Sequence, residues 1–164
     1  MITLGIPADY GQSRGLQIQA EATELVPVAS HPDGRNIQLA PSAARAWNRM
    51  RDGALHSGVT LIAVSGFRSV ERQAAIINAK LLEGEALADI LKAVAAPGYS
   101  EHHTGRAVDI AVPEQPRLTE AFAKTRAFHW LEEYAGAYAF RLSYPKDNPQ
   151  GFIYEPWHWC FVHK

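Results

Sequence analysis

The sequence predicts an α+β domain with a small, mainly antiparallel sheet and flanking helices. Helix-like and strand-like segments are interspersed along 164 residues, a length typical of one domain. The last two strand patterns are joined by a short turn at 145–151, which favours antiparallel pairing over a doubly wound parallel sheet. Hydrophobic residues make up 47% of the chain and charged residues 20%, a composition typical of globular rather than disordered proteins. We therefore expect a single domain over 1–164.

The first part of the chain has few helix signals, and residues 1–24 are expected to form an N-terminal extension or arm. Residues 25–28 predict a short edge strand, because proline is tolerated at the edge of a sheet. Residues 31–34 predict a turn. Ser42 is a suitable N-cap for a helix over 43–56, whose apolar residues recur at helical spacing.

The middle and end of the chain supply the remaining elements. A β-branched apolar run predicts a buried strand over 59–64, and Ser69 is a suitable N-cap for the helix that follows. The predicted elements after residue 69 are helices over 70–82 and 85–95, a loop over 98–106, a strand over 107–112, a helix over 119–134, and strands over 138–144 and 153–162.

Composition and charge exclude several classes of protein. Lys plus Arg number 16 and Asp plus Glu number 17, so the strongly basic surface of a nucleic-acid-binding protein is absent. Cys160 is the single cysteine, which excludes an internal disulfide framework and a multi-cysteine metal site. No apolar run approaches the roughly 18 residues of a membrane span. The N-terminus lacks the features of a secretory signal, which leaves the compartment open.

Two segments bring together residue types that bind metals. The first contains His102, His103 and Asp109, and the second contains Glu155 and His158. Imidazole and carboxylate are common zinc ligands, and a catalytic zinc keeps three protein ligands and a water. Two histidines and one aspartate would form such a site, and a further carboxylate could act as general base. At this point either of the adjacent histidines could be the ligand.

Strand parity divides these residues between faces. Apolar residues share one face of each predicted strand, namely Val108, Ile110 and Val112 in one and Trp157, Trp159 and Phe161 in the other. Asp109 and His158 each fall on the face of their own strand that is opposite these apolar residues. Glu155 has the wrong parity for a regular strand, but Pro156 cannot donate to a ladder, so Glu155 is expected at the strand entrance. This predicts His158 as a rigid ligand and Glu155 as a less constrained acid/base residue.

Each of these residues also has an ordinary structural interpretation. A lone histidine is more often a surface or core residue than a ligand, so four receive no role: His31, His56, His129 and His163. Asp109 could simply end a strand, and Arg68 could form a surface salt bridge. Gln73 could be a solvated helix residue and Ser100 a loop cap. The joint occurrence of ligand types in two segments favours the functional interpretation.

These motifs resemble a known family. Ser100, His102, Gly105, Ala107 and Asp109 match the pattern Ser-x-His-x-x-Gly-x-Ala-x-Asp. Downstream lies Glu-Pro-Trp-His at 155–158, and upstream lie Ser-Gly-Phe-Arg-Ser at 65–69 and Gln73. With these blocks, residues 25–162 resemble the VanY-type zinc D-alanyl-D-alanine carboxypeptidases of peptidase family M15, with related L,D-carboxypeptidases and endolysin peptidases.

The resemblance implies a hedgehog/DD-peptidase-like fold and one zinc ion per chain, held by His102, Asp109 and His158. It implies that Glu155 is the catalytic base and that Arg68 stabilises charge on the scissile carbonyl or the substrate carboxylate. The residues that it places at the substrate are Arg68, Gln73, Ser100, Ser65 and Trp157.

The implied activity is removal of the C-terminal D-alanine from peptidoglycan stem peptides, by D-Ala-D-Ala or L,D-carboxypeptidase action. The alternatives are an L-Ala-D-Glu endopeptidase and, from another class, a catalytically silent zinc-binding domain. The expected partner is a stem peptide or muropeptide, with no nucleic acid and no membrane span. Such a substrate implies the cell envelope or periplasm, although the missing signal peptide keeps a cytoplasmic recycling role open. Sequence does not indicate the oligomeric state.

Overall fold

The computed structural model of the chain describes residues 4–28 and 34–162. Its elements include three short 3-10 helices, η1 to η3. In chain order they are α1 (Tyr10–Ser13), β1 (Val26–Pro27), β2 (Gln38–Leu39), α2 (Pro41–His56), β3 (Ile62–Ser65), α3 (Val70–Leu82), α4 (Leu87–Ala93), η1 (Glu101–Thr104), β4 (Ala107–Ala111), η2 (Glu120–Lys124), α5 (Arg126–Tyr134), η3 (Ala135–Tyr138), β5 (Phe140–Leu142) and β6 (His158–Phe161). The α+β class is confirmed.

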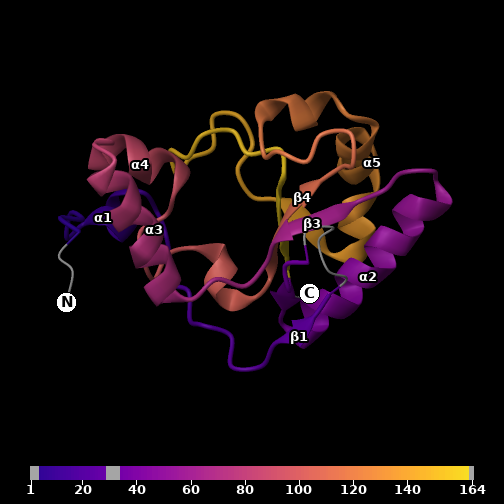
Figure 1. Cartoon of the computed structure of the whole chain (residues 1–164), viewed down its shortest axis with the longest axis horizontal. Helices are drawn as coiled ribbons and strands as arrows, with labels where there is room; N and C mark the ends of the chain where they lie inside the picture. The colour runs from indigo at the N-terminus through magenta and orange to yellow at the C-terminus, as the bar shows by residue number, and fades with distance from the viewer. Residues whose placement is uncertain (1–3, 29–33, 163–164) are drawn as a thin grey trace.

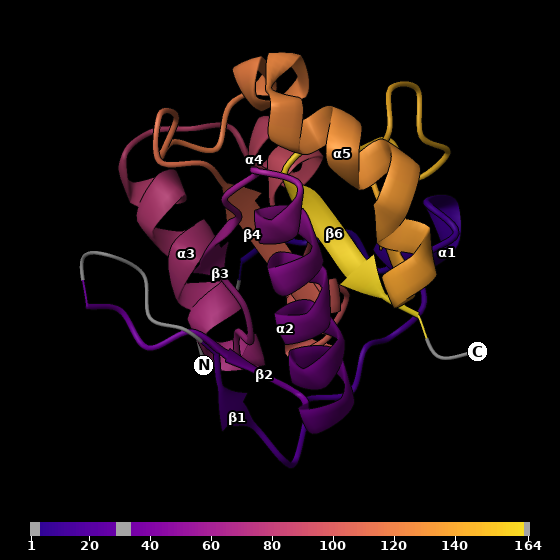
Figure 2. The ribbon, with the colours of Figure 1, turned by 90° about the vertical axis from the view of Figure 1, so that its right-hand side faces the viewer.

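A four-stranded antiparallel sheet lies at the centre of the molecule. Its strand order is β3-β4-β6-β5, and β1 and β2 form a separate two-stranded ladder. Figure 1 shows α2 and α5 on one side of the central sheet and α1, α3 and α4 on the other. In Figure 2, seen from the α2 side, α2 and α5 lie in front of the strands. The sheet therefore separates two helical layers.

The sheet face toward α2 and α5 carries the main hydrophobic core. Trp47 and Met50 of α2 are fully buried there, together with Ile110 of β4, Phe128 of α5 and Trp159 of β6. This is the face that strand parity predicted to be apolar. The opposite face of the same two strands is therefore left for the polar residues.

A second apolar cluster joins α1 to α3 and α4. Tyr10, Ile77 and Ile90 are buried in it, and the partly buried Leu4 and Ile6 pack against it. The segment expected as an N-terminal arm thus packs along the helical layer that faces the polar side of the sheet.

Several element predictions need correction. The helix expected over 119–134 is broken at Thr125, whose hydroxyl accepts a hydrogen bond from the Phe128 amide and caps α5. The strand expected over 153–162 is confined to His158–Phe161, after a turn that contains Pro156. The strand expected over 138–144 begins only at Phe140, because η3 precedes it.

Smaller differences concern loops and boundaries. The loop expected over 98–106 contains η1, and the helix expected over 85–95 is shortened to α4. The edge strand expected over 25–28 is present as β1. Most of the turn expected over 31–34, with His31, lies outside the described residues, as does His163. Among the residues that the structure describes, none of the helices combines the length and apolarity that a bilayer crossing requires.

Candidate metal centre

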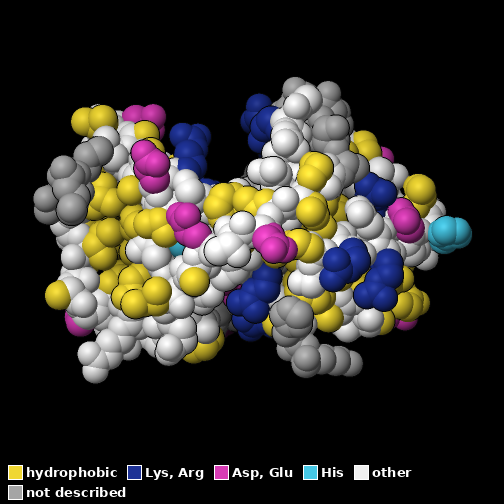
Figure 3. Space-filling view, turned by 90° about the horizontal axis from the view of Figure 1, so that it is seen from below, with side chains coloured by type: hydrophobic (Ala, Val, Ile, Leu, Met, Phe, Trp, Pro, Cys, Tyr) yellow, Lys and Arg dark blue, Asp and Glu magenta, His cyan; other side chains and the backbone are white. Residues whose placement is uncertain are grey.

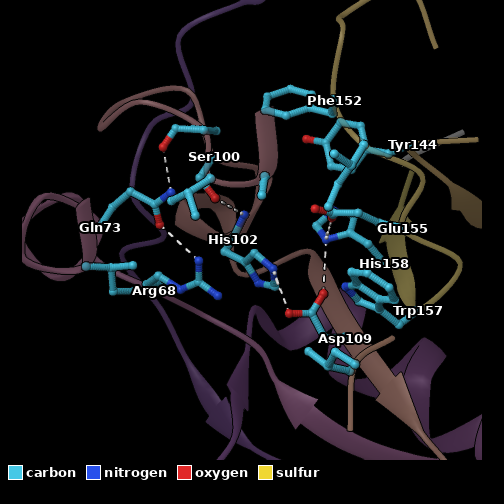
Figure 4. Close-up of a pocket in the computed structure, with 16 residues that line it drawn as sticks. Arg68, Gln73, Ser100, His102, Asp109, Tyr144, Phe152, Glu155, Trp157 and His158 are labelled. Carbon is cyan, nitrogen blue, oxygen red and sulfur yellow. Dashed lines mark hydrogen bonds and ion pairs between the residues drawn. The ribbon is translucent and has the colours of Figure 1, made fainter. Parts of the chain in front are cut away.

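The three residues expected to hold a metal converge on the polar face of the sheet. Asp109 of β4 and His158 of β6 are direct partners in the antiparallel register, so their side chains project from the same face. His102 arrives from η1, immediately before β4. One ligand atom from each residue can be chosen so that all lie within 4.8 Å of one another. All three side chains are buried, and Figure 4 shows them pointing toward one another.

The turn around His102 is set by its flanking residues. The Ser100 hydroxyl accepts a hydrogen bond from the His102 amide and caps η1. Gly105 ends η1 with a φ of 64°, and a Cβ there would lie 2.8 Å from the Ala40 nitrogen. Only glycine adopts this conformation without strain or a clash. The Ser and Gly of the motif therefore act by aiming His102 at β4.

The hydrogen-bond partners of His102 leave two acceptor groups facing each other in this site. The Nδ1 atom of His102 lies 2.6 Å from the Gly66 carbonyl oxygen, so it must carry the proton and donate. The Nε2 atom of a neutral His102 then presents a lone pair to the Asp109 carboxylate, 3.3 Å away. Burial lowers the pKa of His102 and so favours that neutral form. Two acceptors that face each other need a proton or a metal ion between them.

His158 presents a similar arrangement. Its Nδ1 atom lies 3.1 Å from the other Asp109 oxygen, and its Nε2 atom lies 2.9 Å from Glu101. Burial disfavours the charged imidazole, but the hydrogen bonds to Asp109 and Glu101 prevail and raise the pKa of His158 to about 10. The same network holds the pKa of Asp109 well below its usual range despite its burial. Without a metal, the proton of His158 supplies the positive charge.

The donor set and its spacing fit a zinc ion. Imidazole and carboxylate are common zinc ligands, and one such atom from each of His102, Asp109 and His158 can be chosen so that all lie within 4.8 Å of one another. Each imidazole also has its other nitrogen held by an acceptor, the Gly66 carbonyl for His102 and Glu101 for His158. Such outer partners are typical of histidines that bind metals.

His103 is committed elsewhere. Its Nδ1–H donates to the Arg68 carbonyl at 2.7 Å, and its Nε2 accepts from the Gly98 amide at 3.1 Å. The ring is fully buried, and both nitrogens are used. His103 therefore ties the loop at Arg68 to the loop at Gly98, and of the two adjacent histidines only His102 faces Asp109.

Arg68 is held toward the site by polar contacts. Its Nη1 donates to the Gln73 side-chain oxygen at 3.0 Å, and its Nη2 donates to the Ser65 hydroxyl at 3.2 Å. Gln73 is itself buried and donates to the Ala95 carbonyl at 2.6 Å. Gln73 is thus an internal support for Arg68 rather than a solvated helix residue. Ser65 lines an adjoining hollow rather than the main cavity.

Glu155 lies beside the group of His102, Asp109 and His158 without joining it. The His158 amide donates to the Glu155 carbonyl at 3.0 Å, a turn that brings both side chains to the same side of the chain. The Glu155 carboxylate lies 3.9 Å from the His158 Nδ1 atom. Burial raises the pKa of Glu155 to about 7, a value suited to a residue that accepts and returns protons near neutral pH.

These residues border one cavity of about 360 Å³ between the sheet and the layer of α3 and α4. Polar groups line much of it, and Trp157, beside His158 in Figure 4, forms part of an apolar wall. The further wall residues include Ala95, Tyr144, Phe152 and Ile153. The cavity therefore combines a polar and an apolar lining.

The chain is similar to proteins of a known family. Residues 36–164 match the family model VanY, described as D-alanyl-D-alanine carboxypeptidase. The chain belongs to the VanY family. The carboxypeptidase YodJ of Bacillus subtilis is 42% identical over 126 residues, which cover 74% of this chain and 45% of YodJ. The chain therefore spans less than half the length of that VanY-family relative.

Solved structures agree with this assignment. The LdcB LD-carboxypeptidase has a TM-score of 0.78 at 35% identity, over 87% of this chain and 69% of that one. VanYB in complex with D-alanine-D-alanine has a TM-score of 0.68 at 28% identity, over 96% of this chain and 81% of that one. A mutant VanY with Zn(II) has a TM-score of 0.66 at 28% identity, over 96% and 83% of the respective chains. The VanY-type fold is thus shared along nearly the whole chain.

Three residues of this VanY-type site were missed in the sequence. Glu101 contacts His158, Tyr144 stacks on the His158 ring with centroids 4.8 Å apart, and Phe152 lines the cavity. Glu101 lies inside the motif next to His102, but no spacing rule indicates that it contacts a residue near the C-terminus. Tyr144 and Phe152 belong to the segment between β5 and β6, where no periodicity assigns a direction to a side chain.

Proposed function

We propose that this chain is a zinc-dependent carboxypeptidase that removes the C-terminal D-alanine from peptidoglycan stem peptides. The observation that carries the proposal is the buried group of His102, Asp109 and His158, which could hold a metal ion, beside the protonatable Glu155. Membership of the VanY family and the D-alanine-D-alanine and Zn(II) complexes of its neighbours support the choice of substrate and metal.

The metal would be held by His102 through Nε2, by His158 through Nδ1 and by Asp109, since these atoms face one another. Zinc bound there would supply Lewis-acid polarisation of the scissile carbonyl and a water of lowered pKa. Glu101 and the Gly66 carbonyl hold the outer nitrogens of the two rings, which fixes the nitrogen that each ring turns inward.

Glu155 is the residue that moves protons. Its pKa of about 7 allows the carboxylate to accept a proton from the attacking water and the resulting acid to return it to the departing amine. Its position at a turn, outside β6, lets its carboxylate reach the cavity. Its backbone amide donates to the Tyr144 carbonyl at 3.1 Å, which anchors the chain at this point. If the strand extended back regularly to position 155, the side chain there would point to the face opposite His158.

Arg68 supplies a fixed positive charge. The Gln73 and Ser65 contacts restrict its guanidinium before substrate arrives, so little conformational freedom is lost on binding. A guanidinium can donate two parallel hydrogen bonds to a carboxylate or stabilise negative charge that develops on the carbonyl oxygen. Arg68 therefore recognises the peptide end, stabilises the transition state, or does both.

The test is to incubate the protein with zinc and defined pentapeptide and tetrapeptide muropeptides and identify the products by mass spectrometry. Release of D-alanine supports the proposal, and the better of the two substrates assigns D,D or L,D specificity. An internal cut would assign an endopeptidase instead. No cut with a zinc-loaded, folded protein would indicate a silent zinc-binding domain. The Glu155→Gln variant is the control for contaminating activity.

We also propose that the protein acts in the cell envelope or periplasm, because peptidoglycan lies outside the membrane. Fractionation of cells that express the full native gene product tests this. Recovery only in the cytoplasmic fraction would favour a role in the recycling of wall fragments.

A further inference from the structure

The N-terminal segment is anchored to two edges of the substrate cavity by one arginine. The Nε atom of Arg14 donates to the Gln150 carbonyl at 2.6 Å, and its Nη1 donates to the Leu91 carbonyl at 2.6 Å. Leu91 belongs to α4, which leads into the wall residue Ala95, and Gln150 immediately precedes the segment that contains Phe152. Arg14 therefore joins the two chain segments that form the apolar wall.

The same guanidinium packs on aromatic rings. The Cζ atom of Arg14 lies 4.2 Å from the ring centroid of Phe152 and 5.0 Å from that of Tyr10. The Tyr10 hydroxyl accepts from Arg14 at 3.0 Å and from the Ala96 amide at 3.2 Å. Phe152 is thus held from behind by Arg14, and the chain next to Ala95 is held by Tyr10.

A small hydrophobic cluster lies between these anchors and the cavity. Its buried members are Ala95, Tyr144 and Phe152, and all three line the cavity. Leu16 from the N-terminal segment packs against this cluster. In Figure 3 hydrophobic side chains gather on the left of the molecule, on the side where Figure 1 places α1, α3 and α4. The wall is therefore backed by a segment that precedes the family-matched residues.

We propose that Arg14, with Leu16, is a specificity-determining positioning element: it sets the apolar wall against which the end of the peptide substrate packs. Arg14 does not itself line the cavity, whereas Phe152 and Ala95 do. The wall is linked to Arg68, because Gln73 bonds both the Ala95 carbonyl and Arg68. A shift of the wall would alter how closely the substrate end fits without altering the metal ligands or Glu155.

This inference rests on the proposed carboxypeptidase function, and the experiment separates the two. Arg14→Gln, Arg14→Lys and Leu16→Ala are compared with the wild type for zinc content, KM and kcat on the preferred muropeptide. Arg126→Gln is the matched control, since Arg126 also donates to a distant backbone carbonyl, that of Ser57, but away from this cavity. Peptide affinity is measured separately by calorimetry in a Glu155→Gln background, where no turnover occurs.

An imperfect fit of about one methylene group in an apolar pocket costs about 10-fold or more, so Arg14→Gln is expected to raise KM and Kd by about 10-fold. The kcat of this variant and its zinc content should stay close to those of the wild type. Arg14→Lys keeps the charge over Phe152 but not the branched set of donors, so an intermediate KM is expected. Leu16→Ala should raise KM less than Arg14→Gln, and Arg126→Gln should leave KM unchanged.

An active wild type with unchanged KM in Arg14→Gln and Leu16→Ala would overturn the inference, even if both variants melted at lower temperature. Loss of zinc, or a lower kcat, in these variants while their KM stays normal would also overturn the inference. If Arg14→Gln does not fold, Arg14→Lys and Leu16→Ala decide. A wild type that binds the peptide without cleaving it refutes the proposed function, and the Kd values then test the wall. A wild type that does neither refutes both.

Discussion

The contact between Glu101 and His158 allows a direct test of how the metal centre is built. We predict that Glu101→Gln lowers zinc affinity while the fold is retained. The carboxylate lies 2.9 Å from the His158 Nε2 atom, 2.5 Å from the Ser143 hydroxyl and 3.1 Å from Arg141. Burial opposes the charge of Glu101, but the contacts with His158, Ser143 and Arg141 hold its pKa at about 2, so an ionised carboxylate is replaced by a neutral amide of similar size.

The expected loss follows from the role of this contact. Removing an outer partner of a ligating histidine typically weakens metal binding about 10- to 100-fold. At about 1.4 kcal/mol for each factor of ten, this equals about 1.4–2.8 kcal/mol. The glutamine amide can still accept a hydrogen bond from His158, so we expect a loss of zinc affinity in the lower half of that range. The charge-assisted part of the bond is what the substitution removes.

Competition against a chromophoric chelator measures the zinc affinity, and circular dichroism of the metal-free protein checks the fold. Arg141→Gln is the matched control, because its side chain is 57% exposed and its ion pair with Glu101 is weakened by solvent. This control should change zinc affinity by no more than about threefold. A Glu101→Gln protein whose zinc affinity stays within about twofold of the wild type would refute the assigned role of the contact.

Three further predictions concern the same centre. Glu155→Gln should abolish turnover and keep one zinc per chain, and loss of zinc from this variant by elemental analysis would show that the roles are wrong. His102→Ala should lose zinc, whereas a normal zinc content would transfer the ligand role to His103. In the metal-free protein, hydrogen bonds outweigh burial and raise the pKa of His158 to about 10, so zinc must displace its proton below that pH. Zinc affinity should therefore rise with pH by about tenfold per unit between pH 7 and 9, and calorimetry in two buffers should detect release of about one proton per zinc. Equal heats in buffers of different ionisation enthalpy would contradict this.

The ligand positions were predictable because the information for them is local. Parity along β4 separates Asp109 from the apolar Val108 and Ile110, and the same alternation in β6 separates His158 from Trp159. A period of two needs only a few consecutive residues to be recognised. The choice of His102 over His103, in contrast, came from the resemblance, and its physical reason appears only when both nitrogens of His103 are seen to be bonded.

The parts of the site that could not be predicted from the sequence depend on contacts between distant segments. Glu101 meets His158 because β4, which follows η1, pairs with β6, and Ser143 reaches the same carboxylate from the end of β5. Arg14 reaches Gln150 across most of the chain, and no local pattern records that distance. The break at Thr125 is different, because a threonine before an amphipathic run is a cap signal that was present and was outweighed by the length of the apolar pattern.

The metal centre and the hydrophobic core depend on a single strand register. The pair Asp109–His158 is adjacent in the β4–β6 ladder to the pair Val108–Trp159, and the two pairs project from opposite faces. A slip of one residue would turn the aromatic ring toward the cavity and the carboxylate toward the packed helices. Packing of α2 and α5 against the apolar face strongly opposes such a slip, because it would leave a charge buried without a partner. The register that brings Asp109 and His158 together is therefore maintained from the opposite side of the sheet, by residues that never contact the metal or the substrate.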